Sequence, residues 1–381
     1  MDLAASHLEE LRASHFTLDT DRLLLGCAAI LYLPFVFMGP GSDPDSIREL
    51  HSGATLLWQH RYVMSRPPGY FPYELLCGVL YVVGGTIATN CASLAMSLVL
   101  LDAFLRVCER FEVPSRHLLA AAMAMHPIYW TASTSTIDFI WALGCVFVGF
   151  RMLLEGRNWI AGAMLGLAIG IRLSSVLLVA PLLIFEAVVR PRGANLSMAA
   201  AVTIAIGVAC YVPAFVASGN SLAFLTYYAG AWSWTDYLGR FLYKNVYFWG
   251  LPATLFVCAI APTILRALMR CERKFVPIAA MSLSVIVACE MLFLKIPVQR
   301  AYLLPILPFV LIVLAIATRE RPRILLAFAL LVFSYDVVNL NLARPDIPDH
   351  ATHAIVGPFV EPGYLISDVM ARLKLASSSN L

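Results

Sequence analysis

Long apolar runs, separated by short polar segments or by proline and glycine, repeat along most of the chain. A helix needs about 20 mainly apolar residues to cross the hydrocarbon core of a bilayer. Runs of this kind predict about eleven membrane-spanning helices, at 23–39, 91–107, 117–131, 138–154, 158–171, 173–189, 196–217, 247–268, 275–294, 301–317 and 323–340. They divide the chain into an N-terminal tail (1–22), one membrane domain (23–340) and a short polar tail (341–381) with an amphipathic helix near 363–375.

One further apolar segment, residues 71–88, does not have the composition of a crossing helix. It is accompanied by helix breakers and one acid, namely Pro67, Pro68, Pro72, Glu74, Gly84 and Gly85. Lipid-exposed helices seldom tolerate such breakers together with a carboxylate. We therefore predict a re-entrant or interfacial segment that packs on the bundle.

The polar stretch 40–70 before this segment predicts an interfacial helix. Ser46 and Glu49 have the spacing of a capping box, so a helix is expected to start there. Its apolar residues fall on one face, at Ile47, Leu50, Ala54 and Leu57. Such an amphipathic helix is typical of the membrane interface.

The amino-acid composition excludes a soluble globular protein. Of the 381 residues, 60% are hydrophobic and 13% are charged, whereas globular proteins carry about 25% charged residues. The net charge of +3 is spread over many loops without a basic run, so nucleic acid is not an expected partner. The fold class that remains is an all-α polytopic membrane protein.

The 27 lysines and arginines orient this protein in the membrane, because cytoplasmic loops are enriched in them. A cytoplasmic N-terminus with a non-crossing segment 71–88 places most of them inside. An external N-terminus with 71–88 crossing does equally well and differs only in the side of residues 40–70. The breakers in 71–88 favour the first arrangement, in which the loop 40–70 and the tail 341–381 are extracytoplasmic.

Three acids lie at predicted loop ends. Asp43 and Asp45 precede the interfacial helix, and Asp138 begins the fourth predicted span. Carboxylates at such positions commonly cap helices or stabilise the helix dipole. One of them could also face an aqueous cavity as a general base. The two roles are compatible, because a helix N-terminus lowers a carboxylate pKa and keeps the group ionised.

Two arginines lie in apolar surroundings. Arg172 interrupts the apolar stretch 159–189, where burying it costs about 3 kcal/mol, so it is expected to face a cavity or an anion. Glycines at 162, 166 and 170 precede it and allow close helix packing. Arg300 lies at the outer end of the tenth predicted span, where it either snorkels to the interface or binds a ligand.

Aromatic and polar residues alternate in the loop 218–246. They include Trp232, Trp234, Asp236, Arg240 and Lys244. An aromatic belt at the membrane interface explains most of them. The same combination would also suit a sugar ring or an isoprenoid chain.

In their order along residues 23–340, these features resemble the GT-C superfamily of integral membrane glycosyltransferases, such as mannosyl- and aminoarabinose-transferases. That superfamily uses polyprenyl- or dolichyl-phosphate-linked sugars. The resemblance rests on five sequence features: Asp43 and Asp45; Ser65-Arg66-Pro67-Pro68-Gly69-Tyr70 with Pro72 and Glu74; Thr136-Ile137-Asp138; the glycine-containing stretch that ends in Arg172-Leu173-Ser174-Ser175; and Arg300-Ala301-Tyr302-Leu303-Leu304-Pro305 with Pro308.

The resemblance implies roles for particular residues. Asp45 or Asp43 would act as base on the acceptor hydroxyl, with Asp138 assisting, in a displacement that inverts the anomeric carbon. The donor phosphate would bind Arg172 and Arg300, with Arg66, Arg240 and Lys244 as lesser candidates. Tyr70, Glu74, Trp232, Trp234 and Asp236 would contact substrate. The site is expected on the extracytoplasmic side.

The resemblance also leaves questions open. Only about 40 residues follow residue 340, fewer than a large domain that would hold a protein acceptor, so a lipid or glycan acceptor is favoured. A divalent metal, Mg or Mn, beside the three acids is left open. A transporter or flippase of lipid-linked saccharides and a non-catalytic assembly subunit remain the alternatives.

Overall fold

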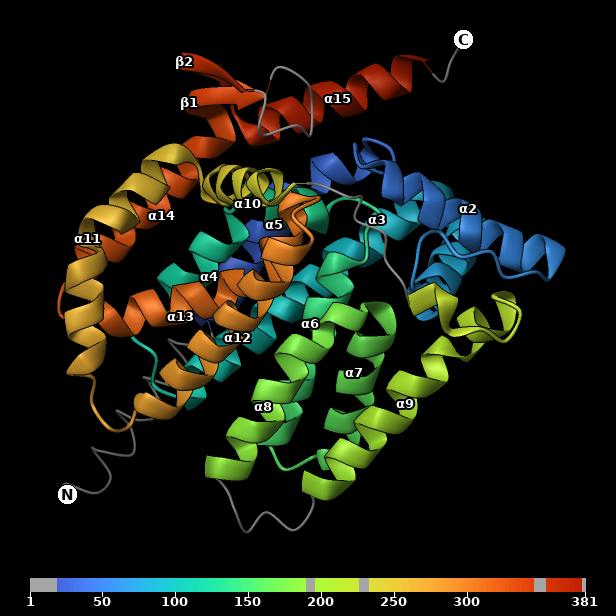
Figure 1. Cartoon of the computed structure of the whole chain (residues 1–381), viewed down its shortest axis with the longest axis horizontal. Helices are drawn as coiled ribbons and strands as arrows, with labels where there is room; N and C mark the ends of the chain where they lie inside the picture. The colour runs from blue at the N-terminus through green and yellow to red at the C-terminus, as the bar shows by residue number, and fades with distance from the viewer. Residues whose placement is uncertain (1–18, 190–195, 226–232, 346–353, 379–381) are drawn as a thin grey trace.

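The computed structural model describes residues 19–189, 196–225, 233–345 and 354–378. Its elements are the helical segment Asp19–Phe37, which ends in η1 (Leu33–Phe37), then α2 (Pro44–Gln59), α3 (Phe71–Arg110), α4 (Arg116–Ala124), α5 (Pro127–Ser133), α6 (Phe139–Leu154), α7 (Asn158–Ile171), η2 (Leu173–Ser175), α8 (Val176–Val189), α9 (Leu196–Ala217), η3 (Leu222–Leu225), α10 (Trp234–Trp249), α11 (Leu251–Met269), α12 (Val276–Lys295), η4 (Arg300–Ile306), α13 (Leu307–Ala317), α14 (Pro322–Val337), β1 (Val338–Pro345), β2 (Ala354–Pro362) and α15 (Tyr364–Ser378). Helices make up nearly all of the bundle (Figure 1).

The predicted all-α membrane fold is confirmed, and the span count stays a prediction. Among the described residues, six helices are long and apolar enough to cross a membrane, and α6, α7 and the segment 173–189 are shorter apolar helices. The predicted span 117–131 is divided into α4 and α5, because the backbone leaves the helical conformation at His126. Proline at the next position disfavours the helical conformation of His126.

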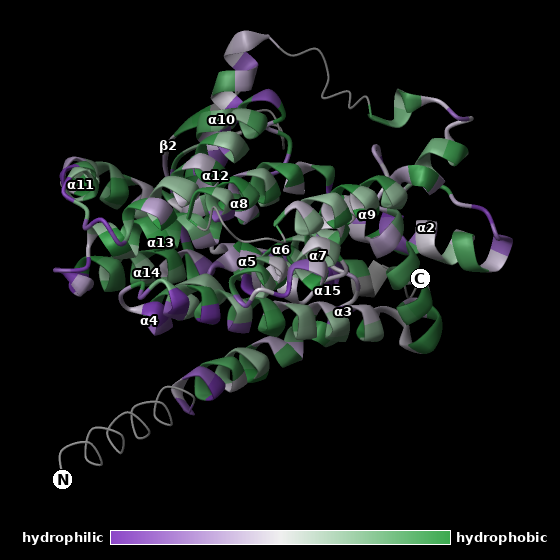
Figure 2. Ribbon diagram, turned by 90° about the horizontal axis from the view of Figure 1, so that it is seen from below, coloured by the Kyte–Doolittle hydropathy of each residue, from purple (hydrophilic) through white to green (hydrophobic). Residues whose placement is uncertain are grey.

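The bundle has a buried centre and an apolar periphery. In α13 every residue from Leu307 to Ile316 except Val310 is buried, whereas Ala253 is the buried residue of α11. Figure 2 shows α9 and α11 as largely hydrophobic ribbons at the outside of the bundle. Apolar side chains left outside the core of a membrane protein face lipid.

Helix α2 begins two residues earlier than predicted and buries a polar face. Asp43 is its N-cap and accepts a hydrogen bond from Asp45 N at 2.9 Å, so the expected capping box of Ser46 and Glu49 is not formed. Glu49 is fully buried, while Ile47 is 54% exposed. The predicted apolar face is therefore only partly correct, because the acids of α2 turn toward the protein interior.

Two glycines bring α2 against the first part of α3. A Cβ atom on Gly78 would lie 2.5 Å from the carbonyl oxygen of Gly53, closer than non-bonded atoms approach. Further along α3, Gly84 and Gly85 interrupt the helix, and Gly85 has a φ of 62° that suits glycine. Residues 71–83 thus form a helical segment packed on α2, set off by this break from residues 86–110.

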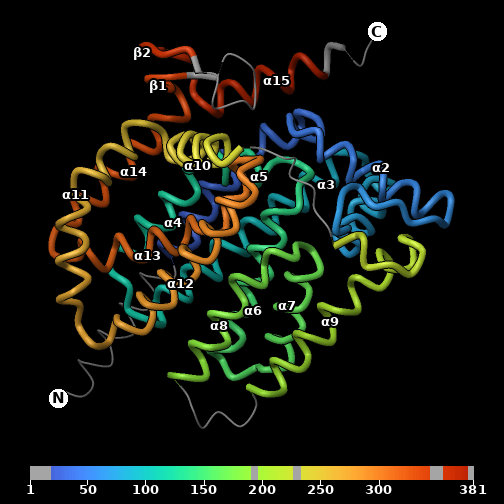
Figure 3. The backbone as a smooth tube through the Cα atoms, viewed as in Figure 1, coloured from blue at the N-terminus to red at the C-terminus, as the bar shows by residue number. Residues whose placement is uncertain are grey.

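The glycines before Arg172 allow α7 to pack closely on α9, as predicted. A Cβ on Gly162 would lie 2.6 Å from Ala199 O, and one on Gly166 would lie 2.8 Å from Thr203 O. Figure 3 shows the two helices side by side. Small residues at four-residue spacing permit such backbone contact.

The C-terminal segment contains a hairpin that the sequence pattern did not predict. Strands β1 and β2 pair antiparallel, with Val338 opposite Pro362, and α15 follows where an amphipathic helix was expected. The last predicted span therefore ends at Val337 instead of residue 340. In Figure 3 these red segments cross one end of the bundle, above α10 and α5.

Arg372 fastens α15 to the bundle. This residue is 2% exposed, and its guanidinium donates to Thr134 O at 3.0 Å and to Thr131 O at 3.3 Å. It also pairs with Asp368 at 2.7 Å, and Asp368 accepts a hydrogen bond from Ser42 Oγ. These contacts join α15 to the end of α5 and to the residues just before α2.

Replacing Gly78 by alanine should separate α2 from α3, because the new methyl group would collide with Gly53. We expect a loss on the order of 1–3 kcal/mol in folding free energy, seen as a lower midpoint of thermal unfolding in detergent. Gly26→Ala is the matched control, since a Cβ there meets nothing within 4 Å. Equal midpoints for Gly78→Ala and the wild type would contradict the close contact.

Replacing Arg372 by methionine should leave the buried Asp368 without its cation. A broken buried pair costs about 3–5 kcal/mol, and we expect thermal unfolding to begin at a correspondingly lower temperature. Lys374→Met changes an exposed cation on the same helix and should have little effect. The double variant Arg372→Met/Asp368→Leu should recover part of the loss, and strictly additive losses would contradict the proposed pairing.

Candidate active site

Two arginines converge on the buried carboxylate of Asp138. Nη1 of Arg172 donates to both carboxylate oxygens, at 2.7 and 2.8 Å, and Nη2 of Arg66 lies 3.1 Å from Oδ2. The Asp138 side chain is fully buried and makes no capping hydrogen bond to α6. A buried carboxylate needs opposite charges and hydrogen bonds, so ion pairing accounts for this acid better than helix capping.

Arg66 connects Asp138 to two acids of α2. Its Nη1 lies 2.9 Å from Asp45 Oδ2, and its Nη2 lies 3.0 Å from Glu49 Oε1. The two acids are four residues apart and therefore share one helix face. We refer to Asp45, Glu49, Arg66, Asp138 and Arg172 together as the charge cluster.

The end of α7 directs Arg172 into the charge cluster. The backbone N–H of Arg172 donates to Ala168 O at 2.9 Å and completes the last turn of α7. The extended φ and ψ of Arg172, −145° and 117°, then end the helix. The guanidinium then lies over the Phe139 ring at 3.9 Å and near the Tyr302 ring at 5.3 Å. Aromatic faces stabilise a cation that has left water.

Glu74 holds the chain segment that carries Arg66. Its carboxylate is fully buried, accepts from Ser65 N at 2.8 Å and from Tyr70 N at 3.3 Å, and also accepts from the Tyr62 hydroxyl. The Tyr70 ring lies under the Arg66 guanidinium, 4.5 Å from Cζ. Glu74 thus fixes the segment 62–70, and its predicted contact with substrate stays a prediction.

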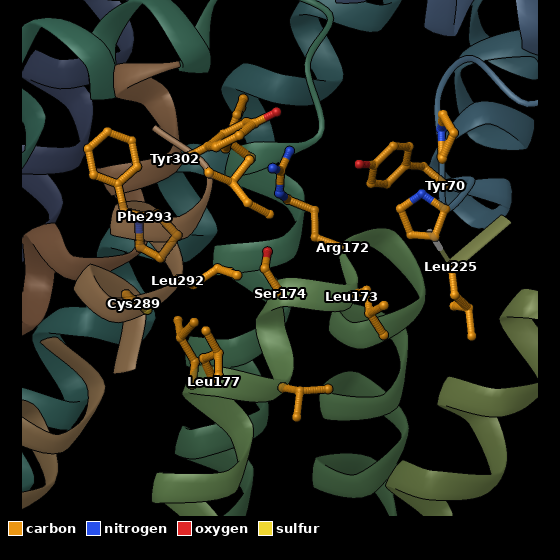
Figure 4. A pocket seen from close by; sticks show the side chains of 17 residues that line it. Tyr70, Arg172, Leu173, Ser174, Leu177, Leu225, Cys289, Leu292, Phe293 and Tyr302 are labelled. Atoms are coloured by element: carbon orange, nitrogen blue, oxygen red, sulfur yellow. The ribbon is translucent and has the colours of Figure 1, made fainter. Parts of the chain in front are cut away.

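A cavity of about 470 Å³ opens beside the charge cluster. Its walls are mainly apolar side chains from α8, α12 and the segment before α3, including Leu177, Leu292 and Phe293 (Figure 4). Arg172 and the hydroxyl-bearing rings of Tyr70 and Tyr302 gather at one end. The cavity therefore has a long apolar part and one charged end.

The other predicted donor-binding residues lie outside the described lining of this cavity. The guanidinium of Arg300 lies over two tyrosine rings, with its Cζ 4.3 Å from the centre of the Tyr247 ring and 4.0 Å from the centre of the Tyr364 ring. Arg240 and Lys244 are buried on α10, where Lys244 Nζ donates to Val298 O. These three cations form a second basic region around α10.

Two of the residues predicted to contact substrate from the loop 218–246, Trp234 and Asp236, do not line the cavity. Trp234 is 68% exposed at the start of α10, and Asp236 completes a capping box with Ser233. Trp232 lies outside the described residues. Substrate contacts by Trp232, Trp234 and Asp236 stay predictions.

Asp43 does not have the lowered pKa that its position at a helix N-terminus suggested. Burial raises the pKa of this carboxyl above its ordinary value, and the neighbouring charge of Asp45 raises it further, although the Asp45 N–H and Arg66 act in the opposite direction. Desolvation of a carboxylate outweighs a single capping hydrogen bond here. Asp43 is half-buried, and its carboxylate caps α2.

Sequence reasoning missed three contributors to the site. Glu49 was assigned to a capping box, yet its spacing of four residues from Asp45 was a usable signal. Gln299 donates to Asp45 Oδ2 at 3.4 Å, and Phe139 lies beneath Arg172. Neither residue type has a motif that reveals a site in sequence, because both act through tertiary contacts.

The charge cluster does not offer the donors that a divalent metal requires. Mg²⁺ and Mn²⁺ bind several carboxylate or water oxygens, whereas the oxygens of Asp45 and Asp138 face guanidinium groups at 2.7–3.1 Å. Among the described residues, no group of three or more His, Cys, Asp or Glu could hold a metal ion.

The chain is similar in structure to solved proteins and similar in sequence to one protein family. Two crystal structures of ArnT from Cupriavidus metallidurans share the fold. The apo form has a TM-score of 0.57 at 16% identity over 85% of this chain and 63% of that one, and the form bound to undecaprenyl phosphate has 0.55 at 17% identity over 79% and 60%. This chain spans less than two thirds of the length of either ArnT chain. No curated protein matches.

The sequence identifies the family. Residues 62–297, which cover more than half of the chain, match the sequence model of glycosyltransferase family 87. The matched range contains Arg66, Asp138 and Arg172 of the charge cluster, and the resemblance to the GT-C superfamily predicted from sequence is confirmed. This multi-pass membrane protein belongs to glycosyltransferase family 87.

Proposed function

We propose that the protein transfers a sugar from a polyprenyl-phosphate-linked donor to a lipid or glycan acceptor on the extracytoplasmic side of the membrane. The observation that carries this proposal is the position of Arg172, which both lines the apolar cavity and pairs with Asp138. A lipid-linked sugar phosphate has the same division into an apolar chain and an anionic head.

The cavity suits the donor. Its leucine, valine and phenylalanine walls match an isoprenoid chain, and transferring such a chain from water into an apolar site is favourable. The contacts of Arg172 with Asp138 use Nη1, and a guanidinium offers further donors from Nη2 and Nε to a phosphate. The ArnT structure that contains undecaprenyl phosphate supports this donor class.

The charge cluster suits a displacement that inverts the anomeric carbon. The acceptor oxygen would form a bond to that carbon while the bond from the carbon to the phosphate oxygen breaks. The acceptor proton would pass to Asp45, and the electron pair of the broken bond would stay on the phosphate beside Arg172. A base and a fixed cation at the two ends of the displacement are the contributions that lower such a barrier.

Asp45 is a better candidate for the base than Asp43. Asp45 is 5% exposed, and its carboxylate belongs to the charge cluster through Arg66, whereas Asp43 caps α2. Asp138 would hold Arg172 in place for the phosphate, since both of its oxygens accept from Nη1.

Glu49 would stay protonated and keep the charge cluster balanced. Burial raises the pKa of Glu49 well above its ordinary value, and the nearby acids raise it further, against the lowering effect of Arg66. With Glu49 neutral, the anions of Asp45 and Asp138 match the buried cations of Arg66 and Arg172, while the exposed side chain of Arg48 also pairs with Asp45 at 3.1 Å. A proton gained by Asp45 would then offset the charge that develops on the leaving phosphate.

Asp45→Asn and Asp138→Asn should each lower sugar transfer by at least about 100-fold, because the first removes the base and the second releases Arg172. Transfer is measured with purified full-length chain, a panel of radiolabelled undecaprenyl-phosphate hexoses and pentoses, and membrane lipid extract as acceptor. Glu49→Gln is the matched control on the same face of α2 and should stay within about threefold of wild type.

The outcomes of this assay separate the competing assignments. A larger loss in Asp43→Asn than in Asp45→Asn would exchange their roles. Wild-type rates in all three aspartate variants would overturn the catalytic assignment. Absence of transfer by the wild type from every donor, with donor binding retained, would favour a transporter or assembly subunit.

The raised pKa of Glu49 also predicts a pH dependence of stability. An unfolded glutamate has a pKa near 4.3, so ionisation of Glu49 costs folding free energy as the pH rises from that value through the folded pKa. Glu49→Gln should therefore lose less stability than wild type when thermal unfolding is followed from pH 4 to 9. Glu112→Gln, at an exposed acid, serves as control. Parallel profiles for Glu49→Gln and wild type would contradict the raised pKa.

A further inference from the structure

A second pocket lies at the far end of α11 from α10. It has a volume of about 410 Å³ and is formed by the last turns of α11 and by the turn between α13 and α14. Helix α11 has 19 residues, so its two ends are about 28 Å apart at 1.5 Å per residue. Figure 1 shows α11 descending from the neighbourhood of α10 to the opposite end of the bundle.

This separation places the pocket and the candidate active site near opposite faces of the membrane. The first end of α11 lies beside α10, where Lys244 contacts Val298, one residue before Gln299 of the candidate site. The far end is about the thickness of a bilayer core away. The positive-inside rule predicts the loops around this far end to be cytoplasmic, because they carry arginines on both sides of the pocket.

Four arginines line the pocket. Arg266 and Arg270 come from α11, and Arg319 and Arg321 come from the turn after α13. Arg319 is already paired with Glu272 at 2.6 Å and lies 3.8 Å from Glu320, an acid that also lines the pocket. In the part of the chain that the structure describes, the other three arginines make no ion pair, so the pocket keeps a surplus of positive charge after these two acids are counted.

Beside the arginines, the walls of the pocket are mixed. Ala267, Ile316 and Ile324 are apolar, whereas Thr263, Thr318 and Glu320 are polar or charged. On the neighbouring surface of α11, Leu265 and Met269 are 60% and 71% exposed. A ligand that fits would therefore join an anionic group to an apolar chain.

Orientation in the membrane explains why arginines occur at this end, but it does not explain why they enclose a hollow. Guanidinium groups held close together repel one another, and a phosphate relieves that repulsion through charge-assisted hydrogen bonds. Basic pockets between membrane helices on the cytoplasmic side are typical sites for anionic lipid head groups.

We propose that this pocket binds the phosphate of an anionic phospholipid in the leaflet opposite the candidate active site, with the acyl chains lying along Leu265 and Met269. The site is separate from the donor cavity and does not depend on the proposed transfer reaction. Its ligand is a phosphodiester, which a free phosphate could imitate only through the head group contacts.

Native mass spectrometry and fluorescence binding with full-length protein in detergent test the proposal. The probes are phosphatidylglycerol, phosphatidylcholine and inorganic phosphate. Wild type should bind phosphatidylglycerol at least tenfold more tightly than phosphatidylcholine, and the variant Arg266→Ala/Arg270→Ala/Arg321→Ala should lose that preference. Arg323→Ala is the matched control, because Arg323 is exposed in the same region but does not line the pocket.

A second variant distinguishes the effect of the space in the pocket from the effect of its positive charge. Ala267→Trp fills the pocket without removing an arginine, and it should also lower phosphatidylglycerol binding at least tenfold while thermal unfolding stays near that of wild type. Equal binding of the two lipids by wild type, or retained preference in both variants, would overturn the proposal. Inorganic phosphate that binds as tightly as phosphatidylglycerol would overturn the lipid assignment in favour of a soluble phosphate.

Discussion

The neutralisation of Asp138 is the interaction on which the arrangement of the site depends. A carboxylate without exposed surface requires cations and hydrogen bonds within reach, since ionised groups are costly to remove from water. Arg172 reaches it from the end of α7, and Arg66 reaches it from the segment before α3. Each partner is in turn held by its own neighbours, Arg172 by aromatic rings and Arg66 by the acids of α2.

That requirement explains several features that are otherwise unrelated. Glycines at the crossings of α2 with α3 and of α7 with α9 allow close packing of the two helices, α2 and α7, that carry or end at Asp45, Glu49 and Arg172. The Glu74 carboxylate accepts hydrogen bonds from the segment that carries Arg66. Arg372 of α15 holds the carbonyl oxygens of Thr131 and Thr134 at the end of α5, four or more residues before Asp138. Several buried polar contacts thus lie in or next to one small region beside an apolar cavity.

Much of the candidate site could be predicted from sequence because charge is scarce in this chain. Asp45, Asp138 and Arg172 were singled out as charges in apolar or loop-end positions, Arg66 followed from the family resemblance, and the structure brings these four together. Arg300, at the end of a predicted span, and the lesser candidates Arg240 and Lys244 instead lie around α10, because a cation near the membrane surface can be stabilised by aromatic rings or carbonyl groups as well as by a ligand. Glu49 was misassigned, since capping spacing is local and the partner Arg66 is seventeen residues away.

The sequence by itself determined the class of fold, since so many apolar residues can be accommodated only when helices face lipid, and it indicated the interruption at Gly84 and Gly85. It also narrowed the chemistry to a few charged residues. Tertiary structure decided the direction in which α2 turns its acids, the hairpin after α14 and the convergence of two arginines on Asp138. The physical reason is that hydropathy and capping act over one or two helical turns, whereas ion pairing in a buried site depends on which segments distant in sequence come together.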